Sequence, residues 1–503
     1  MHLDAHLIEL IVVIFYFAVL ILLSIYGIHR GIMVYLYWKY RGFRRDVKER
    51  FEQLPPVTVQ LPIFNEMYVV ERLIDAVCSI EYPLDKFEVQ VLDDSTDETR
   101  KIAKAIVERF QAKGFDIHYI HRENRVGFKA GALAEGLRHA KGEFIAVFDA
   151  DFIPTKDTLM QTIHYFTDPE IGMVQVRWGH VNSEYSLLTK IQSIMLDGHF
   201  VIEHTARNLS GRFFNFNGTA GIWRKEAIIT SGGWQHDTLT EDLDLSYRAQ
   251  MKGWKFLFVP NVISPAEVPV EINSFKSQQH RWAKGSIQTC RKLLPRIFKS
   301  NLPWWIKVES FFHLTSNISY VLMMILSFFM LPSLIIRYEQ GWQNIMILDL
   351  PIFLIGTMSV TSFYFLSQKE VYNDWWARIK YIPLLMSLGI GLSVNNSKAV
   401  LEALFGFESE FKRTPKYGIK KSSDNWEHKK YRVSKSALVL IELAFTVYFG
   451  VTIYYAILSQ LYFSVPFLML FFFGFSYTSL ISLVQSNSGW VMLKQRPVAD
   501  AQG

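Results

Sequence analysis

Two aspartates separated by one small residue follow an apolar stretch of strand length. Asp149 and Asp151 come directly after residues 144–148. Alternate residues of an extended chain point the same way, so both carboxylates can face one ligand. At the carboxyl end of a strand they suit a hard divalent cation, Mg²⁺ or Mn²⁺, that also holds a diphosphate. The alternative is an ordinary turn with two exposed acids, which is the commoner explanation when this pattern stands alone.

A second acidic pair and a lysine are expected near the same sheet edge. Asp93 and Asp94 close another short β-branched stretch, and Lys129 lies in the glycine-flanked segment 127–131. The aspartates can form a helix N-cap, or they can accept hydrogen bonds from a uracil imide or a ribose hydroxyl. Lys129 can be a solvated lysine, or the cation at a helix start that borders a diphosphate. The residue types leave both alternatives open.

The tripeptide Thr240-Glu241-Asp242 offers a general base. As structure it is a capping box, with a threonine followed by acids at a helix start. As chemistry it supplies a carboxylate on the acceptor side of a transfer reaction. Transfer of a sugar from a nucleotide diphosphate to an alcohol needs the acceptor hydroxyl deprotonated while the leaving diphosphate is neutralised.

Gln278, Arg281 and Trp282 lie in an amphipathic stretch, residues 274–298. A helix of this kind with one tryptophan is usually only a packed helix. Here a polar amide stands beside a guanidinium able to grip phosphate in bidentate fashion, and beside an indole face on which a pyranose ring can stack. The three groups together describe a site for a diphosphate and a sugar.

Short β-branched strands alternate with helical stretches from about residue 55 to residue 270. Strands are expected at 57–62, 87–92, 117–121 and 143–148, and helices from 66 towards 79, over 99–113 and from 129 onwards. This alternation predicts an α/β fold with a mostly parallel sheet and helices on both faces. The loops at the carboxyl ends of the strands would then carry the acidic pairs and Lys129 to one rim.

The composition bounds the class of protein. The 503 residues are 50% hydrophobic and 15% aromatic, which is too long for one ordinary domain and too apolar for a wholly soluble chain. The net charge of +6 is modest, and the basic residues flank apolar runs, so no nucleic-acid partner is expected. With only Cys78 and Cys290, we expect no disulfide framework, no cysteine zinc site, and a soluble part in a reducing compartment.

Five membrane spans are expected. The first covers residues 10–26 and precedes a basic flank, so the N-terminus should lie outside. Four later apolar runs, 314–336, 346–366, 437–458 and 461–484, can each cross a hydrocarbon core of about 30 Å. Residues 382–404 are assigned instead to a helix on the cytoplasmic surface. Counting them as a span would place residues 408–435 outside, although these hold nine Lys or Arg against four acids. The C-terminus should then lie inside.

The four clusters occur in the order and approximate spacing of known motifs. Asp93-Asp94, Asp149-Ala150-Asp151, Thr240-Glu241-Asp242 and Gln278-x-x-Arg281-Trp282 resemble the D, DxD, TED and QxxRW motifs of processive, membrane-embedded family-2 glycosyltransferases of the cellulose synthase type. The sequence around these motifs is similar to that of plant cellulose-synthase-like mannan and glucan synthases and their bacterial relatives. The resemblance implies a GT-A-like nucleotide-sugar-binding domain, with a mostly parallel sheet, inserted in an α-helical transmembrane bundle.

The resemblance also implies a role for each matching residue. Asp242, with Glu241, would be catalytic, and Asp242 would act as the base. Asp149 and Asp151 would hold the Mg²⁺ or Mn²⁺ ion. The donor would be contacted by Asp93, Asp94, Lys129, Asp149, Gln278, Arg281, Thr414 and Lys416. The acceptor would be contacted by Trp282, Phe216, Asn217 and Gly218.

Residues 411–416 are similar to the cytoplasmic gating loop of the family, whose pattern is FxVTxK. Phe411, Thr414 and Lys416 match this pattern, while Arg413 stands at the valine position. The bacterial cellulose synthases carry a C-terminal regulatory domain. Here the chain ends soon after the last expected span, so no built-in cyclic-dinucleotide sensor is expected.

The expected organisation divides the chain into eight segments. They are an N-terminal transmembrane helix (1–38), a basic cytoplasmic linker (39–54), a cytosolic glycosyltransferase domain (55–272), interface helices with the QxxRW motif (273–312), two transmembrane helices (313–368), a surface helix with the gating-type loop (369–436), two more transmembrane helices (437–486) and a cytoplasmic tail (487–503).

The function implied by the resemblance is inverting, processive synthesis of a β-linked glucan or mannan that passes through the enzyme's own spans. UDP-glucose is the first expected donor and GDP-mannose the second. The growing glycan, the lipid bilayer and possible export subunits are the other expected partners, in the plasma (inner) membrane or in the Golgi membrane of a eukaryote. The alternative is a single transfer to a lipid, as by a ceramide glucosyltransferase or a polyprenyl-phosphate sugar synthase. A non-enzymatic transporter or receptor is the third candidate.

Overall fold

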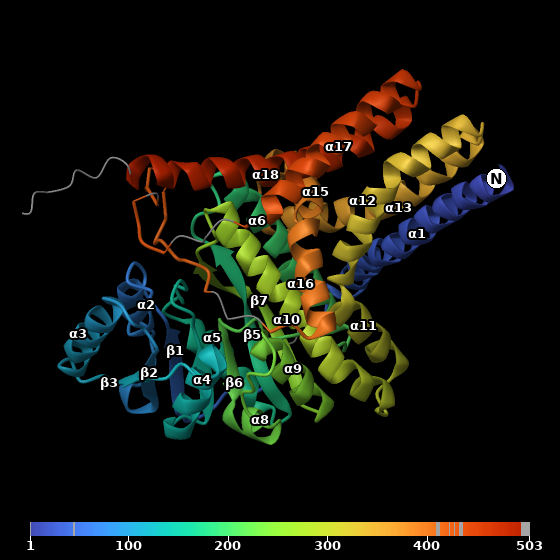
Figure 1. The fold of residues 1–503 in the computed structure, drawn as a ribbon. Coiled ribbons are helices and arrows are strands. Elements are labelled where there is room, and N and C mark those ends of the chain that lie inside the picture. Colours follow the sequence, from blue (N-terminus) through green and yellow to red (C-terminus); the bar gives the residue numbers. More distant parts are fainter. Residues whose placement is uncertain are drawn as a thin grey trace, which may run out of the picture.

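The computed structural model describes residues 2–43, 46–408, 413–421, 423–426, 428–431 and 436–493. Figure 1 shows a sheet covered by helices, and long helices that project away from it. The strands are β1 (Val57–Ile63), β2 (Phe87–Asp93), β3 (Asp116–His121), β4 (Phe144–Val147), β5 (Ile171–His180), β6 (Gly221–Arg224) and β7 (Lys255–Ala266). The predicted combination of an α/β domain with a helical bundle is confirmed.

The seven strands form one sheet in the order β3-β2-β1-β4-β6-β5-β7. β1 pairs in parallel with β2 and β4, and β2 pairs in parallel with β3. β6 is antiparallel to β4 and β5, whereas β5 and β7 are parallel. The sheet is therefore mostly parallel, as predicted, with one reversed strand. Because β1, β2 and β4 end at the same edge, the residues that follow them gather there.

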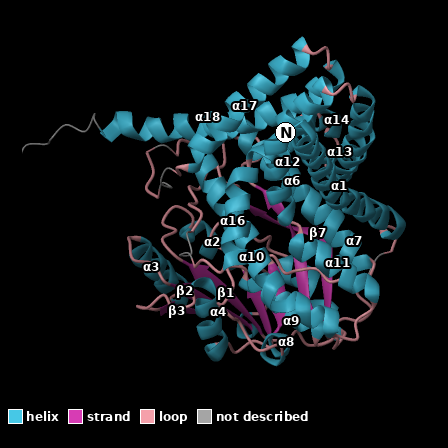
Figure 2. Cartoon of the chain, turned by 45° about the vertical axis from the view of Figure 1, so that its right-hand side comes forward, coloured by secondary structure: helices cyan, strands magenta, loops and turns pink. Residues whose placement is uncertain are grey.

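Helices cover both faces of this sheet (Figure 2). They are α2 (Val70–Val77), α3 (Thr99–Gln111), α4 (Phe128–His139), α5 (Thr158–Thr162), α6 (Leu187–Asp197), the π-helical turn η3 (Gly198–His204), α7 (Thr205–Leu209), α8 (Lys225–Thr230) and α9 (Glu241–Met251). Alternate residues of β4 enter two separate cores: Phe144 and Ala146 belong to one, and Ile145 and Val147 belong to the other. This alternation is expected of a strand that is buried on both faces.

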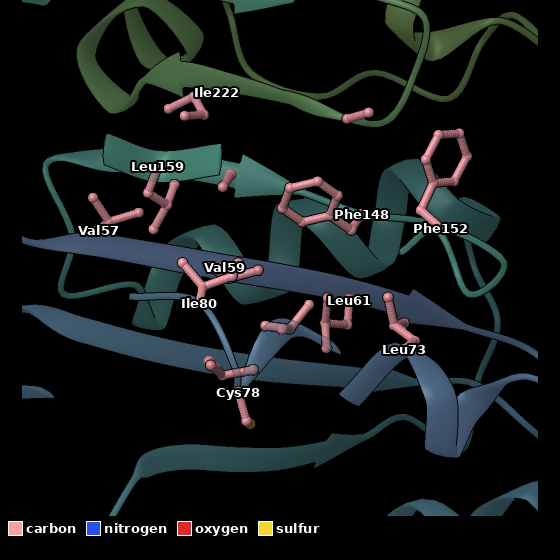
Figure 3. Packing of buried hydrophobic residues seen from close by; sticks show 14 of the residues in the cluster. Val57, Val59, Leu61, Leu73, Cys78, Ile80, Phe148, Phe152, Leu159 and Ile222 are labelled. Carbon is pink, nitrogen blue, oxygen red and sulfur yellow. The ribbon is translucent and has the colours of Figure 1, made fainter. Parts of the chain in front are cut away.

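The first of these cores joins β1 to the helices that precede β2 and follow β4. In Figure 3, Val59 and Leu61 of β1 lie close to Leu73 and Cys78, and Phe148 lies on the other side of the strand. All of these side chains are buried. The apolar packing fixes the strand ends, and so fixes the polar residues that follow them.

The remaining helices form the bundle and its base. They are α1 (His2–Tyr40), α10 (Ile272–Lys299), α11 (Trp304–Thr315), α12 (Ile318–Glu339), α13 (Gln343–Val371), α14 (Trp375–Ile379), α15 (Ile382–Gly391), α16 (Ser393–Phe405), α17 (Leu438–Leu458) and α18 (Val465–Leu493). Within the described ranges, five helices are long and apolar enough to cross a membrane, namely α1, α12, α13, α17 and α18. They coincide with the five expected spans.

The region expected to be a single surface helix differs from that expectation. It consists of α15 and α16, which are bent by 44° at their junction, and the pair together would pass as a sixth span by length and composition. α15 packs closely on α18. The approach is so close that a Cβ on Gly391 would lie only 2.4 Å from the carbonyl oxygen of Gly474. Small residues at both positions permit this approach, and the position of the pair relative to a bilayer stays a prediction. Phe411 and Lys412 of the expected gating loop, and residues 494–503 of the expected tail, lie outside the described residues.

Candidate active site

Most residues predicted to carry chemistry surround one cavity. It has a volume of about 180 Å³ and opens beyond the carboxyl ends of β1 and β4, between this sheet edge, the start of α9, α10 and residues 413–416. The predicted residues that line it are Asp94, Lys129, Asp149, Asp151, Asn217, Gly218, Glu241, Asp242, Gln278, Arg281, Trp282, Thr414 and Lys416. Segments that are far apart in the sequence therefore meet at this edge.

Two lysines neutralise the aspartates that follow β4. Lys129 Nζ lies 2.5 Å from Asp149 Oδ1 and donates to the carbonyl oxygen of Gly218 at 2.9 Å. Lys416 Nζ lies 2.7 Å from Asp151 Oδ2. Burial disfavours the charged form of Lys129, but the neighbouring carboxylates, Asp149 first, raise its pKa above the ordinary value. The rim therefore holds alternating charges where a charged ligand can bind.

The two aspartates fit a divalent cation. They offer the carboxylate oxygens that Mg²⁺ and Mn²⁺ prefer, and backbone contacts hold both in place. The backbone N–H of Asp149 donates to Thr219 Oγ1 at 2.8 Å, and the backbone N–H of Glu267 donates to Asp151 Oδ2 at 3.3 Å. Asp149 and Asp151 would thus hold the ion against a diphosphate bound at the rim.

A second group of possible metal ligands lies elsewhere. Glu88, Asp116 and His118 bring ligand atoms within 4.8 Å of one another. They lie at the amino ends of β2 and β3, at the edge opposite the cavity. Lys141 Nζ lies 2.7 Å from Asp116 Oδ2. None of these three possible ligands lines the cavity, so this group is separate from the candidate active site.

Only one of the two acids that close β2 faces the cavity. Asp94 lines it, and Arg122 NH2 lies 2.5 Å from Asp94 Oδ2. Asp93 is fully buried and accepts hydrogen bonds from the Tyr119 hydroxyl at 2.6 Å and from the backbone N–H of Ser95 at 2.9 Å. Successive side chains of a strand point to opposite sides. Asp94 thus stays the predicted nucleoside contact, while Asp93 stabilises the turn behind it.

Asp242 lies in the first turn of α9 and has the surroundings of a general base. Its Oδ1 accepts from the backbone N–H of Leu243 at 2.8 Å. Its Oδ2 lies so near Gly218 that a Cβ there would be 3.0 Å away, and Gly218 has a left-handed φ of 80°. Burial and the charge of Glu241 raise the pKa of Asp242 to about 7. A carboxylate with this pKa can accept a proton from a hydroxyl near neutral pH.

Gln278, Arg281 and Trp282 lie on one face of α10, because side chains three and four positions apart are neighbours on a helix. All three line the cavity. The beginning of this helix is fixed by a buried ion pair, since Lys276 Nζ lies 2.7 Å from Glu442 Oε2 of α17. The helix that presents these side chains is therefore attached to the apolar bundle.

Residues 413–416 close the cavity on the side facing β1. Arg413 NH1 lies 2.6 Å from Glu66 Oε2. Glu267 accepts the three backbone N–H groups of residues 417–419 at 2.7–3.2 Å. Burial raises the pKa of Glu66 to about 7 even though Arg413 opposes this shift. Two carboxylates thus fasten residues 413–419 over this side of the cavity.

The residues that line the cavity differ in part from those predicted from the sequence. Phe216 does not line the cavity: it is fully buried and packs edge-on against Trp223, with Trp234 beyond. Glu66 and Glu267 do line it, although neither is among the residues predicted from the sequence. Glu66 follows the end of β1 as the predicted acids follow β2 and β4, and this placement could have identified it. Glu267 follows β7 in a loop with no distinguishing local pattern.

Comparisons with known proteins bear on the same region. Residues 55–285 match the family described as glycosyltransferase like family 2. The chain is 41% identical over 294 residues to glucomannan 4-beta-mannosyltransferase 2 of Arabidopsis thaliana, covering 55% of this chain and 54% of that protein. It is 35% identical over 364 residues to glucomannan 4-beta-mannosyltransferase 7 of the same plant, covering 70% and 66%. The chain thus spans about half to two thirds of the length of these curated relatives.

A solved structure shares the fold. It is the mannosyltransferase PcManGT from Pyrobaculum calidifontis in complex with GDP-Man and Mn²⁺, with a TM-score of 0.53 and 20% sequence identity, covering 78% of this chain and 99% of that chain. At this identity the likeness concerns the fold alone, and it confirms the predicted GT-A-like sheet. The matched residues 55–285 include every strand of the sheet and the first half of α10. Through these residues, the chain belongs to the family-2 glycosyltransferases.

Proposed function

We propose that the protein is an inverting mannosyltransferase that extends a β-linked, mannan-type glycan from GDP-mannose. The observation that carries this proposal is the placement of Asp149, Asp151 and Asp242 around one cavity. The relatives are named glucomannan 4-beta-mannosyltransferases, and the structure with a similar fold holds GDP-Man and Mn²⁺. These names favour GDP-mannose over UDP-glucose, which reverses the order expected from the sequence.

The proposed reaction is a single displacement. Asp242 takes the proton of an acceptor hydroxyl as its oxygen attacks the anomeric carbon of the donor sugar. The bond between that carbon and the diphosphate oxygen breaks, and its electron pair leaves with GDP. One displacement on an α-linked donor gives a β-linked product. Lys129 and Arg281 offset the charge that grows on the diphosphate, and a divalent ion held by Asp149 and Asp151 would add positive charge there.

Repeated transfer with export is supported by further cavities within the bundle. One of about 300 Å³ lies among α1, α12, α13, α15 and α18. Another of about 50 Å³ lies among α1, α12, α13 and the start of α18. Leu196 lines the active-site cavity, and its neighbour Met195 lines the larger bundle cavity. Phe353 and Phe467 line both bundle cavities. This row of spaces gives a growing chain a direction of travel, which a single transfer to a lipid would not require.

We infer a topology of five crossings with the sheet domain on the cytosolic face. Arg378, which precedes α15, has NH2 3.2 Å from Glu184 Oε1 of the sheet domain. Lys416, which follows α16, contacts Asp151 of the same domain. The bent pair α15–α16 therefore begins and ends on one side, as a re-entrant segment does. The basic residues of 408–435 support the cytosolic side for both contacts, and a Golgi membrane is the proposed location in a eukaryotic cell.

Labelled donors test this proposal. Membranes that contain the protein are supplied with radiolabelled GDP-mannose or UDP-glucose and with Mn²⁺ or Mg²⁺. We expect mannose to enter a polymer that endo-β-mannanase cleaves. A single labelled lipid would instead support the one-transfer alternative, and polymer from UDP-glucose alone would contradict the choice of donor. No incorporation from either donor would contradict the enzyme itself.

A further inference from the structure

Two histidines of the turn η3 hold the side-chain amide of Asn217. His204 Nε2 lies 2.5 Å from Asn217 Oδ1, and His199 Nε2 lies 2.9 Å from Asn217 Nδ2. An amide oxygen only accepts hydrogen bonds, and an amide nitrogen only donates them. His204 must therefore carry a proton on Nε2, while His199 must present an unprotonated Nε2. The two rings are complementary to one orientation of the amide.

The π-helical geometry of η3 brings these rings together. Residues five positions apart on an α-helix differ by about 140° around its axis and face different sides. In a π-helix the hydrogen bonds join residues i and i+5, so such residues lie one turn apart. The ring centroids of His199 and His204 are 4.4 Å apart. The rare helical turn thus makes a two-ring clamp that an ordinary helix of this sequence would not make.

The hydrogen-bond partners of each ring fit the tautomer that the amide requires. Burial lowers the pKa of His204 well below its ordinary value, and within the described part of the chain its Nδ1 has no hydrogen-bond partner. His204 is therefore neutral with its proton on Nε2. His199 Nδ1 lies 2.9 Å from Glu203 Oε2 and donates to it. Burial would raise the pKa of Glu203, but the charge of Arg207 holds it well below its usual range, so the carboxylate can accept the Nδ1 proton of His199.

Asn217 belongs to the loop that contacts the predicted catalytic and metal-binding groups. Its neighbour Gly218 faces Asp242, since a Cβ on Gly218 would lie 3.0 Å from Asp242 Oδ2. Thr219 Oγ1 accepts the backbone N–H of Asp149 at 2.8 Å. A shift of the Asn217 side chain would therefore move the surroundings of the base and of the metal-binding carboxylates together.

A chain of charged groups connects this clamp to the first long helix. Glu203 Oε2 lies 3.4 Å from Arg207 NH1, and Arg207 Nε donates to Glu309 Oε1 at 2.8 Å. Glu309 Oε2 lies 3.0 Å from His29 Nε2 of α1. Burial would raise the pKa of Glu309, but Arg207 and His29 lower it to about 2, so the carboxylate stays charged. Unbroken polar contacts thus run from α1 to Asn217.

We propose that His199 and His204 are positioning residues for sugar transfer, which fix the Asn217 amide and thereby place residues 217–219 against Asp242. This inference rests on the proposed transferase function. Neither histidine is among the described residues that line the cavity. Neither should therefore touch the donor. Their effect is exerted through Asn217, on the acceptor side.

A matched pair of variants tests the clamp in the full-length protein. His204→Gln keeps a donor near the position of Nε2, whereas His204→Leu fills the buried space without one. For His204→Leu we expect kcat to fall about tenfold or more while the Kd of GDP-mannose changes by less than about twofold. For His204→Gln we expect kcat within about threefold of the original protein. Equal loss in both variants, or loss in neither, would overturn the proposal.

A second readout does not depend on activity. Hydrogen exchange of the peptide 213–220 should be faster in His204→Leu than in the original protein, and unchanged in His204→Gln, because the clamp keeps this loop closed. His139→Ala, at an exposed histidine of α4, serves as the control and should change nothing. Unchanged exchange in His204→Leu would refute the clamp.

Combining variants separates a local effect from a general loss of packing. If His204 acts through Asn217, His204→Leu should add no further loss of kcat to Asn217→Ala. Full additivity would contradict the coupling. If the original protein transfers no sugar at all, the proposed function fails, and the hydrogen-exchange comparison still decides whether the clamp exists.

Discussion

The two walls of the cavity are built in different ways. The donor wall, formed by Lys129, Asp149 and Asp151, sits on residues that directly follow β4 or begin α4, so the register of the sheet places it. The acceptor wall, formed by Asn217, Gly218 and Trp282, depends on η3, on a loop and on α10. Of these, η3 contacts α1, and α10 contacts α11 and α17. The three side chains of the donor wall are thus fixed by the sheet domain, although Gln278 and Arg281 of α10 are also expected to contact the donor. The groups that would receive the growing chain are fixed by contacts with the bundle.

The largest expected effect comes where the two walls meet, at Asp242. Asp242→Asn removes the proposed base and should lower kcat by about a thousandfold, within the usual range for such groups. The amide is isosteric, so GDP-mannose should still bind with a Kd within about threefold of the original value. Transfer assays and nucleotide titration measure the two quantities separately. Equal loss of both would show that Asp242 mainly binds the donor.

Breaking the donor wall should abolish metal-dependent donor binding. Asp151→Asn removes one carboxylate oxygen from the proposed ion. Loss of an outer-shell partner alone commonly costs about 10- to 100-fold in metal affinity or activity, so loss of a direct ligand should cost at least that much. Calorimetric titration of GDP-mannose with and without Mn²⁺ measures this. Asp116→Asn is the matched control, because Asp116 belongs to the acidic group at the opposite sheet edge. Loss of Mn²⁺ dependence in that control would show that the metal binds at the opposite sheet edge instead.

Breaking the acceptor wall should act on the acceptor and spare the donor. Trp282→Ala removes the aromatic face. We take this contact to contribute about 1.5 kcal/mol beyond simple burial, so its loss should raise the acceptor KM roughly tenfold. The KM for GDP-mannose should change little. Kinetics with a manno-oligosaccharide acceptor at varied concentration separate the two constants. A rise confined to the donor KM would show that Trp282 belongs to the donor wall.

The smallest expected effect is a shift in pH dependence. Asp242 must be ionised to accept a proton, so kcat/KM should fall as the pH drops below the pKa of about 7. The charge of Glu241 contributes to that raised pKa. Glu241→Gln removes this charge, lowers the pKa and should move the acid limb of the profile to lower pH. A limb that stays in place would show that Glu241 does not influence the base.

The donor wall could be predicted from the sequence because its signals are local. Asp149 and Asp151 follow an apolar strand, and strand ends on one edge of a parallel sheet must lie together. The same local rule could not separate Asp93 from Asp94, since the backbone turn after β2 decides which side chain enters the cavity. It also left Phe216 in the site, although an aromatic side chain in an apolar loop packs into the core by default.

The acceptor wall was only partly predictable because long-range contacts build it. Trp282 could be selected from its spacing with Gln278 and Arg281, but no local pattern marks the π-helical turn or pairs His199 and His204 with Asn217. The bend between α15 and α16 depends on close contact with α18, which hydropathy cannot show. The place of Glu267 in the site depends on residues 417–419, which fold onto it from a distant part of the sequence.

The buried ammonium of Lys276 bears on how the lipid environment acts on turnover. It is held by Glu442 of α17 and by the Thr478 carbonyl and Ser482 hydroxyl of α18. A change in tilt of either apolar helix displaces these three oxygens and carries the start of α10 with them. The indole of Trp282 lies less than two turns farther along the same helix. The thickness of the surrounding bilayer would in this way set how closely an acceptor approaches the base.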